Sequence, residues 1–134
     1  MMMEVPQYAE VMQLSEADEW RLLKIGQAEA GNQSIDGIAL VMQVVLNRLE
    51  KDGYADTIEG VISQEGQFQS YANGSYFKAV PSDYCYLALD EIEAGLFMSH
   101  PIIAFEVAGA RTLDKHYSYA FTMGDHDFYT EKIE

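Results

Sequence analysis

Apolar positions recur at helical spacing in two neighbouring segments near the N-terminus. The first begins at Ser15, a residue type that caps helix N-termini, and acidic residues follow it in the first turn. This pattern predicts a helix to about Ala30 that is ended by Gly31-Asn32. The second segment begins after Ser34 and is apolar around most of its circumference, which predicts a buried helix ending near Lys51-Asp52-Gly53.

The next part of the chain predicts shorter helices separated by a polar loop. Thr57 has the chemistry of a cap for a short helical turn through Ile62. Residues 64–74 are rich in Gly, Gln, Ser and Asn, and we expect an ordered loop there. Pro81-Ser82-Asp83 then opens another helix, for which Gly95 is the expected stop.

The C-terminal part has the character of strands. Residues 102–107 are mostly apolar, residues 116–122 alternate aromatic with small or polar side chains, and Phe128-Tyr129 predicts a last short strand. Helices followed by strands predict an α+β domain. The length of 134 residues suits one domain, so we expect an N-terminal arm over residues 1–14 and a single domain over residues 15–134.

Composition restricts the possible partners. The chain has 22 acidic and 8 basic residues, a net charge of -14, and no basic cluster, so we expect no nucleic-acid partner. An acidic interaction module is a weaker alternative, because the acids are scattered rather than massed in a run. The longest apolar stretch, Ile38 to Leu46, is too short to span a bilayer, and Met1 to Tyr8 does not have the pattern of a signal peptide.

Cys85 is the only cysteine, so no intrachain disulfide can form. It lies between Tyr84 and Tyr86 in a predicted helix. We interpret it as a buried, inert thiol, since a nucleophile would need a histidine partner.

Glu29 is the unusual residue of the first helix, because it falls on the apolar face at helical spacing from Leu22, Ile25 and Gly26. Burial and the negative end of the helix should both raise its pKa, and a protonated glutamate can act as a general acid in glycoside cleavage. The alternative is a glutamate that turns outward or pairs with a cation, and periodicity alone favours this alternative. The candidate cations are Arg21, Lys24 and Arg48.

Other polar residues allow structural or binding roles. Asn47 could brace buried backbone and Arg48 could pair with an acid. In Gly66-Gln67-Phe68, the amide could bind an N-acetyl group and the ring could pack on a sugar, although a buried phenylalanine anchor explains the segment equally well. His126 lies between two aspartates, but alternate side chains of an extended chain face opposite ways, so we expect no metal site and no cofactor.

Several of these segments, taken in order, resemble the SleB-type cell wall hydrolases known from spore cortex-lytic enzymes. The resemblance covers roughly residues 20–130. Each piece is short, but the ordered set at this spacing is specific. The matching segments are Glu29-Ala30-Gly31, Gly37, Val45-Leu46-Asn47-Arg48, Thr57-Ile58-Glu59-Gly60-Val61-Ile62, Gln64-Glu65-Gly66-Gln67-Phe68 and Gly124-Asp125-His126-Asp127-Phe128-Tyr129.

The resemblance implies a lysozyme-like α+β fold, with N-terminal helices followed by a small C-terminal antiparallel sheet. It also implies cleavage of peptidoglycan between N-acetylmuramic acid and N-acetylglucosamine, with Glu29 as the acid. A lytic transglycosylase needs only this carboxylate, because the muramic 6-hydroxyl replaces water and closes an anhydro ring. Asp36 and Glu65 are candidates for a second carboxylate in a hydrolytic reaction. The expected substrate-binding residues are Gln67, Phe68, Tyr117, Tyr119 and His126.

One region departs from the family pattern, which usually has a Tyr-rich strand followed by Asn-Pro. Here Ile102 to Val107 contains neither, and we expect Tyr117-Ser118-Tyr119 to replace it. The remaining alternatives are a non-catalytic glycan-binding module and a zinc-dependent amidase. We expect a monomer, encoded by a bacterium or a phage, that acts at the cell wall in lysis, remodelling or germination.

Overall fold

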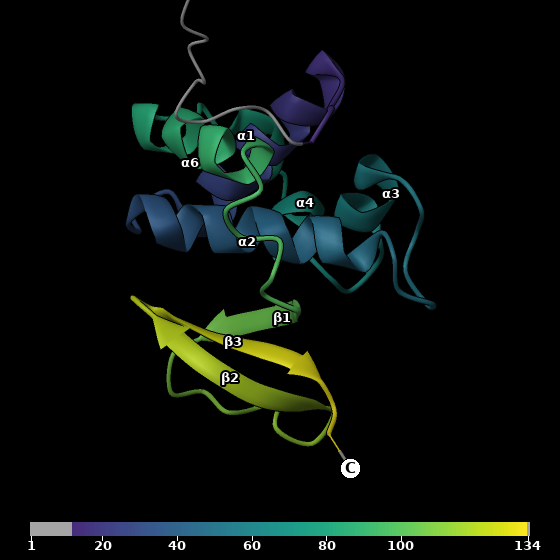
Figure 1. The fold of residues 1–134 in the computed structure, drawn as a ribbon. Coiled ribbons are helices and arrows are strands. Elements are labelled where there is room, and N and C mark those ends of the chain that lie inside the picture. Colours follow the sequence, from purple (N-terminus) through teal and green to yellow (C-terminus); the bar gives the residue numbers. More distant parts are fainter. Residues whose placement is uncertain (1–11, 134) are drawn as a thin grey trace, which may run out of the picture.

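The computed structural model describes residues 12–133, so most of the predicted N-terminal arm lies outside the described residues. Helices come first and strands last (Figure 1), which confirms the predicted α+β class. In order, the elements of residues 12–133 are α1 (Glu16–Ala30), α2 (Ile35–Arg48), α3 (Ile58–Ser63), α4 (Gln69–Ala72), α5 (Ser75–Lys78), α6 (Asp83–Glu93), β1 (Ile102–Val107), β2 (Tyr117–Met123) and β3 (His126–Glu131).

The predicted starts of α1, α2 and α3 are confirmed by their capping bonds. The hydroxyl of Ser15 accepts a hydrogen bond from the backbone N–H of Asp18 at 3.1 Å, and Ser34 does the same for α2. Thr57 caps α3 through the backbone N–H of Gly60 at 3.0 Å. The loop prediction for residues 64–74 is wrong in part, because α4 lies inside it. A four-residue helix is too short to produce a helical period in the sequence.

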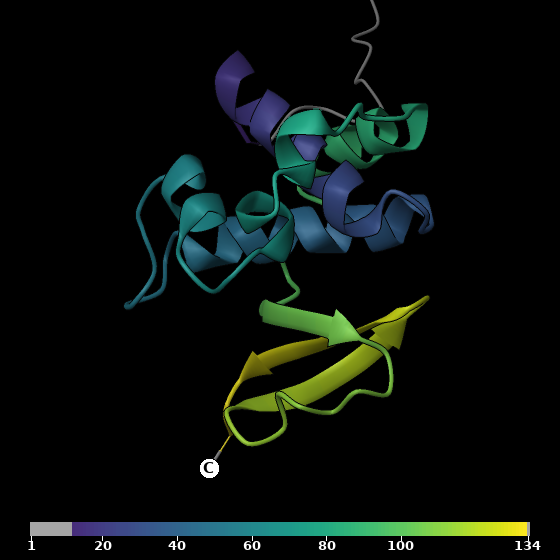
Figure 2. The same cartoon turned by 180° about the vertical axis from the view of Figure 1, so that it is seen from behind.

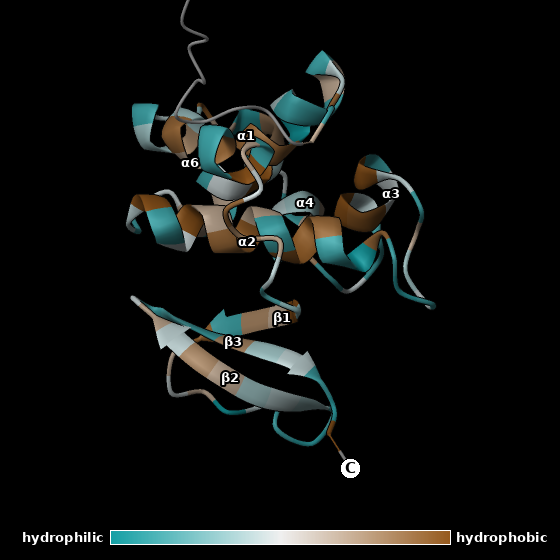
Figure 3. Ribbon diagram, viewed as in Figure 1, coloured by the Kyte–Doolittle hydropathy of each residue, from teal (hydrophilic) through white to brown (hydrophobic). Residues whose placement is uncertain are grey.

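Helix α2 is the centre of the core. It lies between the sheet on one side and α1 and α6 on the other (Figures 1 and 2), and apolar residues recur along its whole length (Figure 3). Helix α1 approaches it closely at Gly26, where an added Cβ would lie 2.9 Å from the Met42 methyl group and 3.0 Å from Ile38. This close approach sets the position of α1 three residues before Glu29.

The three strands form an antiparallel sheet in the order β1-β3-β2. Phe128 of the central strand pairs in register with Phe105 of β1 and Phe121 of β2, and its ring lies 5.8 and 5.5 Å from theirs. Phe105 in turn contacts Phe68 of the helical half, with ring centroids 6.1 Å apart. Aromatic packing therefore joins the sheet to the helices.

Two further predictions can be compared with the structure. Cys85 is fully buried in α6, and its thiol donates to the amide oxygen of Gln27 at 3.3 Å, which confirms a buried thiol. Within residues 12–133, every helix is too short or too polar to cross a bilayer.

Candidate active site

A cavity of about 260 Å³ lies between the C-terminal end of α1, the segment that enters α4, and strands β1 and β3. It brings together four residues that the sequence predicted for the site, namely Glu29, Gln67, Phe68 and His126. These residues come from three separate parts of the chain. The wall is completed by Arg48, Gln69, Phe105, Glu106 and Val107.

Glu29 lies on the wall of this cavity and is partly buried. Among residues 12–133, no cationic nitrogen lies within 4.0 Å of its carboxylate, and no hydrogen bond occupies it. The alternative that Glu29 pairs with a neighbouring cation is therefore wrong. Arg21 pairs with Asp18 at 2.8 Å, and Lys24 lies over aromatic rings instead. The carboxylate of Glu29 is thus available to a substrate.

His126 opens strand β3 and faces the same cavity. Its ring lies edge-on to Phe105 and Phe128, with centroid distances of 5.2 and 6.1 Å. Burial lowers the pKa of His126, and the negative charges of Glu29 and Asp125 only partly oppose this effect. The Nδ1 atom is buried and has no hydrogen-bond partner among the described residues. Burial of the ring therefore disfavours the charged form of His126 beside Glu29.

Arg48 lies at the end of α2 and is 5% exposed. Its Nε donates to the carbonyl oxygen of Ile103 at 2.8 Å, and its guanidinium lies over the rings of Tyr54 and Phe68 at 4.9 and 5.2 Å. Burial lowers its pKa. The expectation that Arg48 pairs with an acid is wrong, since a backbone carbonyl and two ring faces hold it. Its Nη1 atom is buried without a hydrogen-bond partner among residues 12–133.

Asn47 attaches the helical wall of the cavity to the strand wall. Its side-chain N–H groups donate to the carbonyl oxygens of His100 and Ile102 at 2.8 and 2.7 Å, and its own oxygen accepts from Gln43. This confirms the bracing role expected for Asn47. Together with Arg48, it fixes the start of β1 against α2, so adjacent residues of one helix set the separation of the two walls.

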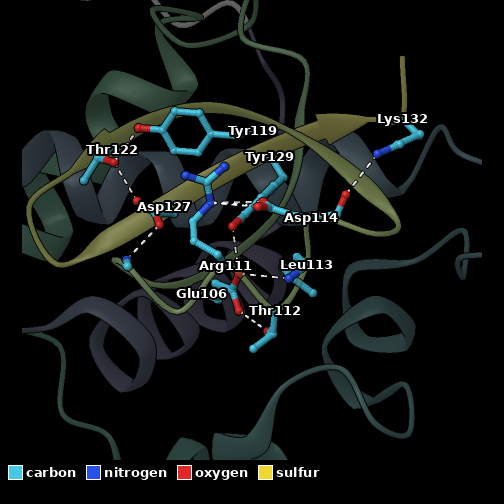
Figure 4. A network of polar contacts seen from close by, with 11 residues as sticks. Glu106, Arg111, Thr112, Leu113, Asp114, Tyr119, Thr122, Asp127, Tyr129 and Lys132 are labelled. Atoms are coloured by element: carbon cyan, nitrogen blue, oxygen red, sulfur yellow. Dashed lines mark hydrogen bonds and ion pairs between the residues drawn. The ribbon is translucent and has the colours of Figure 1, made fainter. Parts of the chain in front are cut away.

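Glu106 is a second carboxylate on the wall, and the sequence analysis missed it. Because side chains alternate along a strand and Phe105 faces Phe68, the carboxylate of Glu106 turns away toward residues 108–116. It accepts hydrogen bonds from the Thr112 hydroxyl, from the Leu113 N–H at 3.0 Å and from the Tyr129 hydroxyl at 2.7 Å (Figure 4).

The hydrogen bonds to Glu106 occupy its carboxylate oxygens and favour the ionised form. Burial alone would raise the pKa of Glu106, but the hydrogen bonds outweigh it and lower the pKa. Neither Asp36 nor Glu65, the two carboxylates considered from the sequence, lines the cavity. Of the two carboxylates on this wall, Glu29 is therefore the one whose oxygens accept no hydrogen bond from the residues that the structure describes. An acidic residue inside an otherwise apolar strand was the only sequence signal for Glu106.

A second cavity has a volume of about 540 Å³. Gln67 lines both cavities, so the two adjoin at this residue. Tyr117 lies in this second cavity, with its hydroxyl 3.3 Å from that of Tyr54. Tyr119 lines neither cavity. It packs edge-on against Tyr129 and under Arg111, and its hydroxyl contacts Thr122 at 2.6 Å. We call the two adjoining cavities the cleft. The predicted Tyr-rich element is therefore divided, because Tyr117 lies in the cleft and Tyr119 lies on another part of the sheet.

The surroundings of the histidines bear on the metal site that the sequence analysis considered. Asp127 is buried and accepts hydrogen bonds from the Gly109 N–H and the Thr122 hydroxyl, whereas its neighbour His126 faces the cavity. In the part of the chain that the structure describes, no group of three His, Cys, Asp or Glu side chains is placed to hold a metal ion.

The sequence profile of the Cell Wall Hydrolase family matches residues 32–129, and the chain belongs to this family. The match begins three residues after Glu29, so Glu29 lies outside the matched residues. Its place on the cavity wall is therefore known from the structure and not from the family match. No curated protein matches the chain.

Two solved structures resemble the fold of this chain. The catalytic domain of the germination-specific lytic transglycosylase SleB from Bacillus anthracis aligns with a TM-score of 0.71 and 18% identity, over 94% of this chain and 100% of that chain. The catalytic domain of SleB from Bacillus cereus aligns with a TM-score of 0.72 and 18% identity, over 88% and 93% of the two chains. The family match and these two structures confirm the resemblance to the SleB-type family. At 18% identity, the structural similarity shows that the fold is shared.

Proposed function

We propose that this chain cleaves the glycan strands of peptidoglycan between N-acetylmuramic acid and N-acetylglucosamine, as a lytic transglycosylase. The observation that carries this proposal is Glu29, a carboxylate on the wall of a cavity that has no ion pair or hydrogen bond among residues 12–133, in a chain of the Cell Wall Hydrolase family. Peptidoglycan is the substrate that membership of the Cell Wall Hydrolase family suggests for this chain.

In the proposed reaction, Glu29 acts first as an acid and then as a base. The protonated carboxyl donates its proton to the glycosidic oxygen as the bond to C1 of the muramic acid breaks. The resulting carboxylate then takes the proton of the muramic 6-hydroxyl, whose oxygen bonds to C1 and closes the anhydro ring. Glu29 ends protonated, so one carboxyl group completes the cycle without water as a nucleophile.

The other residues of the cleft suit binding rather than proton transfer. Gln67 is exposed between the two cavities, where its amide can exchange hydrogen bonds with an N-acetyl group. Phe68 is 4% exposed and anchors the wall under Arg48, while the Tyr117 hydroxyl lines the adjoining cavity. We assign Gln67 and Tyr117 to substrate contact, and Phe68 and His126 to the shape of the wall beside Glu29.

The experiment is digestion of purified peptidoglycan by wild type and Glu29→Gln, with release of soluble fragments as the readout. We expect a loss of about 10²- to 10⁴-fold, the usual contribution of a positioned acid. Glu65→Gln and Asp36→Asn are matched controls that neutralise carboxylates outside the cavity, and both should cleave like wild type.

Equal activity of Glu29→Gln and wild type would overturn the assignment of the acid. Wall binding by wild type without any fragment release would instead favour a non-catalytic binding module. Release of stem peptides that is abolished by a chelator would favour a zinc-dependent amidase.

A further inference from the structure

A pocket of about 230 Å³ lies on the helical half of the molecule, where α1, α3, α4 and α5 meet. Its lining includes four aromatic and two cationic side chains, namely Trp20, Tyr71, Tyr76, Phe77, Arg21 and Lys24. The catalytic cleft shares none of these residues. In Figure 2 the N-terminal half of α1 lies at the end of the molecule remote from the sheet.

The geometry of α1 separates this pocket from Glu29. Trp20 and Glu29 are nine residues apart on one helix, which corresponds to about 14 Å along the axis and to roughly opposite sides of it. A ligand in this pocket is therefore bound by a different face of the protein from a ligand in the cleft.

The rings form an aromatic surface that is open to solvent. Phe77 packs against Tyr71 and Tyr76 with centroid distances of 5.0 and 5.2 Å, which fixes its orientation. Yet Phe77 is 56% exposed and Trp20 is 47% exposed. Clustered aromatic exposure of this kind marks a binding surface more often than isolated exposed residues do.

Lys24 supplies a positive charge to this surface. Its ammonium lies 4.8 Å from the ring centroid of Tyr76, 5.5 Å from that of Phe77 and 6.0 Å from that of Trp20. Among residues 12–133, no carboxylate lies within 4.0 Å of it.

The nearby charges do not neutralise Lys24. Glu59 also lines the pocket, but it lies 3.8 Å from Arg21, which in turn pairs with Asp18. In a chain with 22 acidic and 8 basic residues, a lysine that lies over aromatic rings and has no ion pair among residues 12–133 is complementary to an anionic ligand with apolar faces.

We propose that this pocket is a second peptidoglycan-binding site, which holds the wall while the cleft cleaves it. The exposed faces of Trp20 and Phe77 receive the apolar face of a sugar ring, and Lys24 binds a carboxylate of muramic acid or of its stem peptide. The proposal rests on the proposed substrate. It also accounts for how a chain of net charge -14 attaches to an anionic polymer, because contact is made at a local cation.

Trp20 provides a direct test, because it is the only tryptophan of the chain. Soluble glycan fragments that carry stem peptides are titrated into Glu29→Gln, and Trp20 emission is recorded. We expect a saturable change in emission, weakened roughly 3- to 10-fold by Phe77→Ala added to this background. Lys24→Gln should weaken binding of these fragments but not of uncharged N-acetylglucosamine oligomers, and Lys24→Arg should keep the binding of both.

A second test uses the insoluble wall. Trp20→Ala with Phe77→Ala should reduce co-sedimentation with peptidoglycan and slow its digestion, while cleavage of short soluble fragments stays at the wild-type rate. The matched control is Tyr84→Ala with Tyr86→Ala, which removes two aromatic side chains that are 54% and 48% exposed on α6. This control should bind and digest like wild type.

Wild-type wall binding by the Trp20/Phe77 variant, or an emission that does not respond to the fragments, would overturn the proposal. Equal losses on short soluble fragments and on the wall, in a variant with an unchanged melting temperature, would also overturn it. If wild type binds the wall through this pocket but releases no fragments, the proposed catalytic function fails and the binding site stands.

Discussion

The two walls of the cleft are built by different means. The helical wall carries Glu29 on a helix whose depth is set by the close approach of Gly26 to α2, so backbone packing places the carboxylate that we propose as the acid. The strand wall depends on side-chain hydrogen bonds, chiefly from Asn47 to the carbonyl oxygens of His100 and Ile102. Backbone packing positions the wall that carries Glu29, whereas the facing wall is held by these hydrogen bonds together with the contact of Phe105 with Phe68.

The largest effect should follow from breaking that attachment. Asn47→Ala removes the bonds to His100 and Ile102 and leaves two partly buried carbonyl groups without this donor, so we expect a loss of about 2–4 kcal/mol in the free energy of unfolding. Urea denaturation gives this value. Asn32→Ala, at an exposed position with a local contact to Gln33, should leave it nearly unchanged. Similar stabilities of the two variants would contradict the attachment of β1 through Asn47.

Glu106 tests whether the strand wall takes part in the chemistry. Glu106→Gln should lower the free energy of unfolding by about 1–2 kcal/mol, because an amide cannot accept every bond that Thr112, Leu113 and Tyr129 donate. Cleavage of peptidoglycan should remain close to wild type. Loss of cleavage at unchanged stability would instead make Glu106 a second catalytic carboxylate.

His126 should make the strand wall sensitive to pH. Because its pKa is lowered in the folded protein, the unfolded chain binds the proton first as the pH falls through the ordinary value of about 6.5. The contribution of His126 to stability is therefore present above that pH and is lost below it. We expect the melting temperature of wild type to fall more than that of His126→Gln between about pH 7.5 and pH 5.5. His116→Gln, at an exposed histidine, should behave like wild type.

The smallest effect distinguishes the two tyrosines of β2. Tyr117→Phe removes a hydroxyl from the cavity beside Gln67, and we expect a loss of about 2- to 10-fold in cleavage rate, as for one hydrogen bond to a ligand. Tyr119→Phe should have no effect on cleavage, because Tyr119 lines neither cavity. Equal effects at the two positions would contradict the division of the Tyr-rich element.

Much of the helical wall could be predicted from the sequence. Caps and apolar periodicity located α1 and α2, and the spacing of Glu29 from Ile25 placed it on the inner side of α1. These signals are local, because a cap or a helical period depends only on residues that are close together in the sequence. The strand at 102–107 was also predicted with its observed limits.

The strand wall was harder to predict because its contacts join distant parts of the chain. Nothing near Glu106 in sequence indicates that Tyr129 would bind it. An acid was the one partner considered for Arg48 from the sequence, whereas a carbonyl and two rings hold it in the structure. The short helix α4 was missed for a different reason, since four residues are too few to produce a helical period in the sequence.

In the reaction that we propose, Glu29 works without water as the nucleophile. The most direct measurement is digestion of peptidoglycan by wild type in water enriched in oxygen-18, with mass spectrometry of the released muropeptides. We predict products with anhydro-muramic ends, each lighter than the hydrolysed fragment by one water and free of the isotope. Reducing muramic ends that carry oxygen-18 would contradict the account and require a second group to activate water.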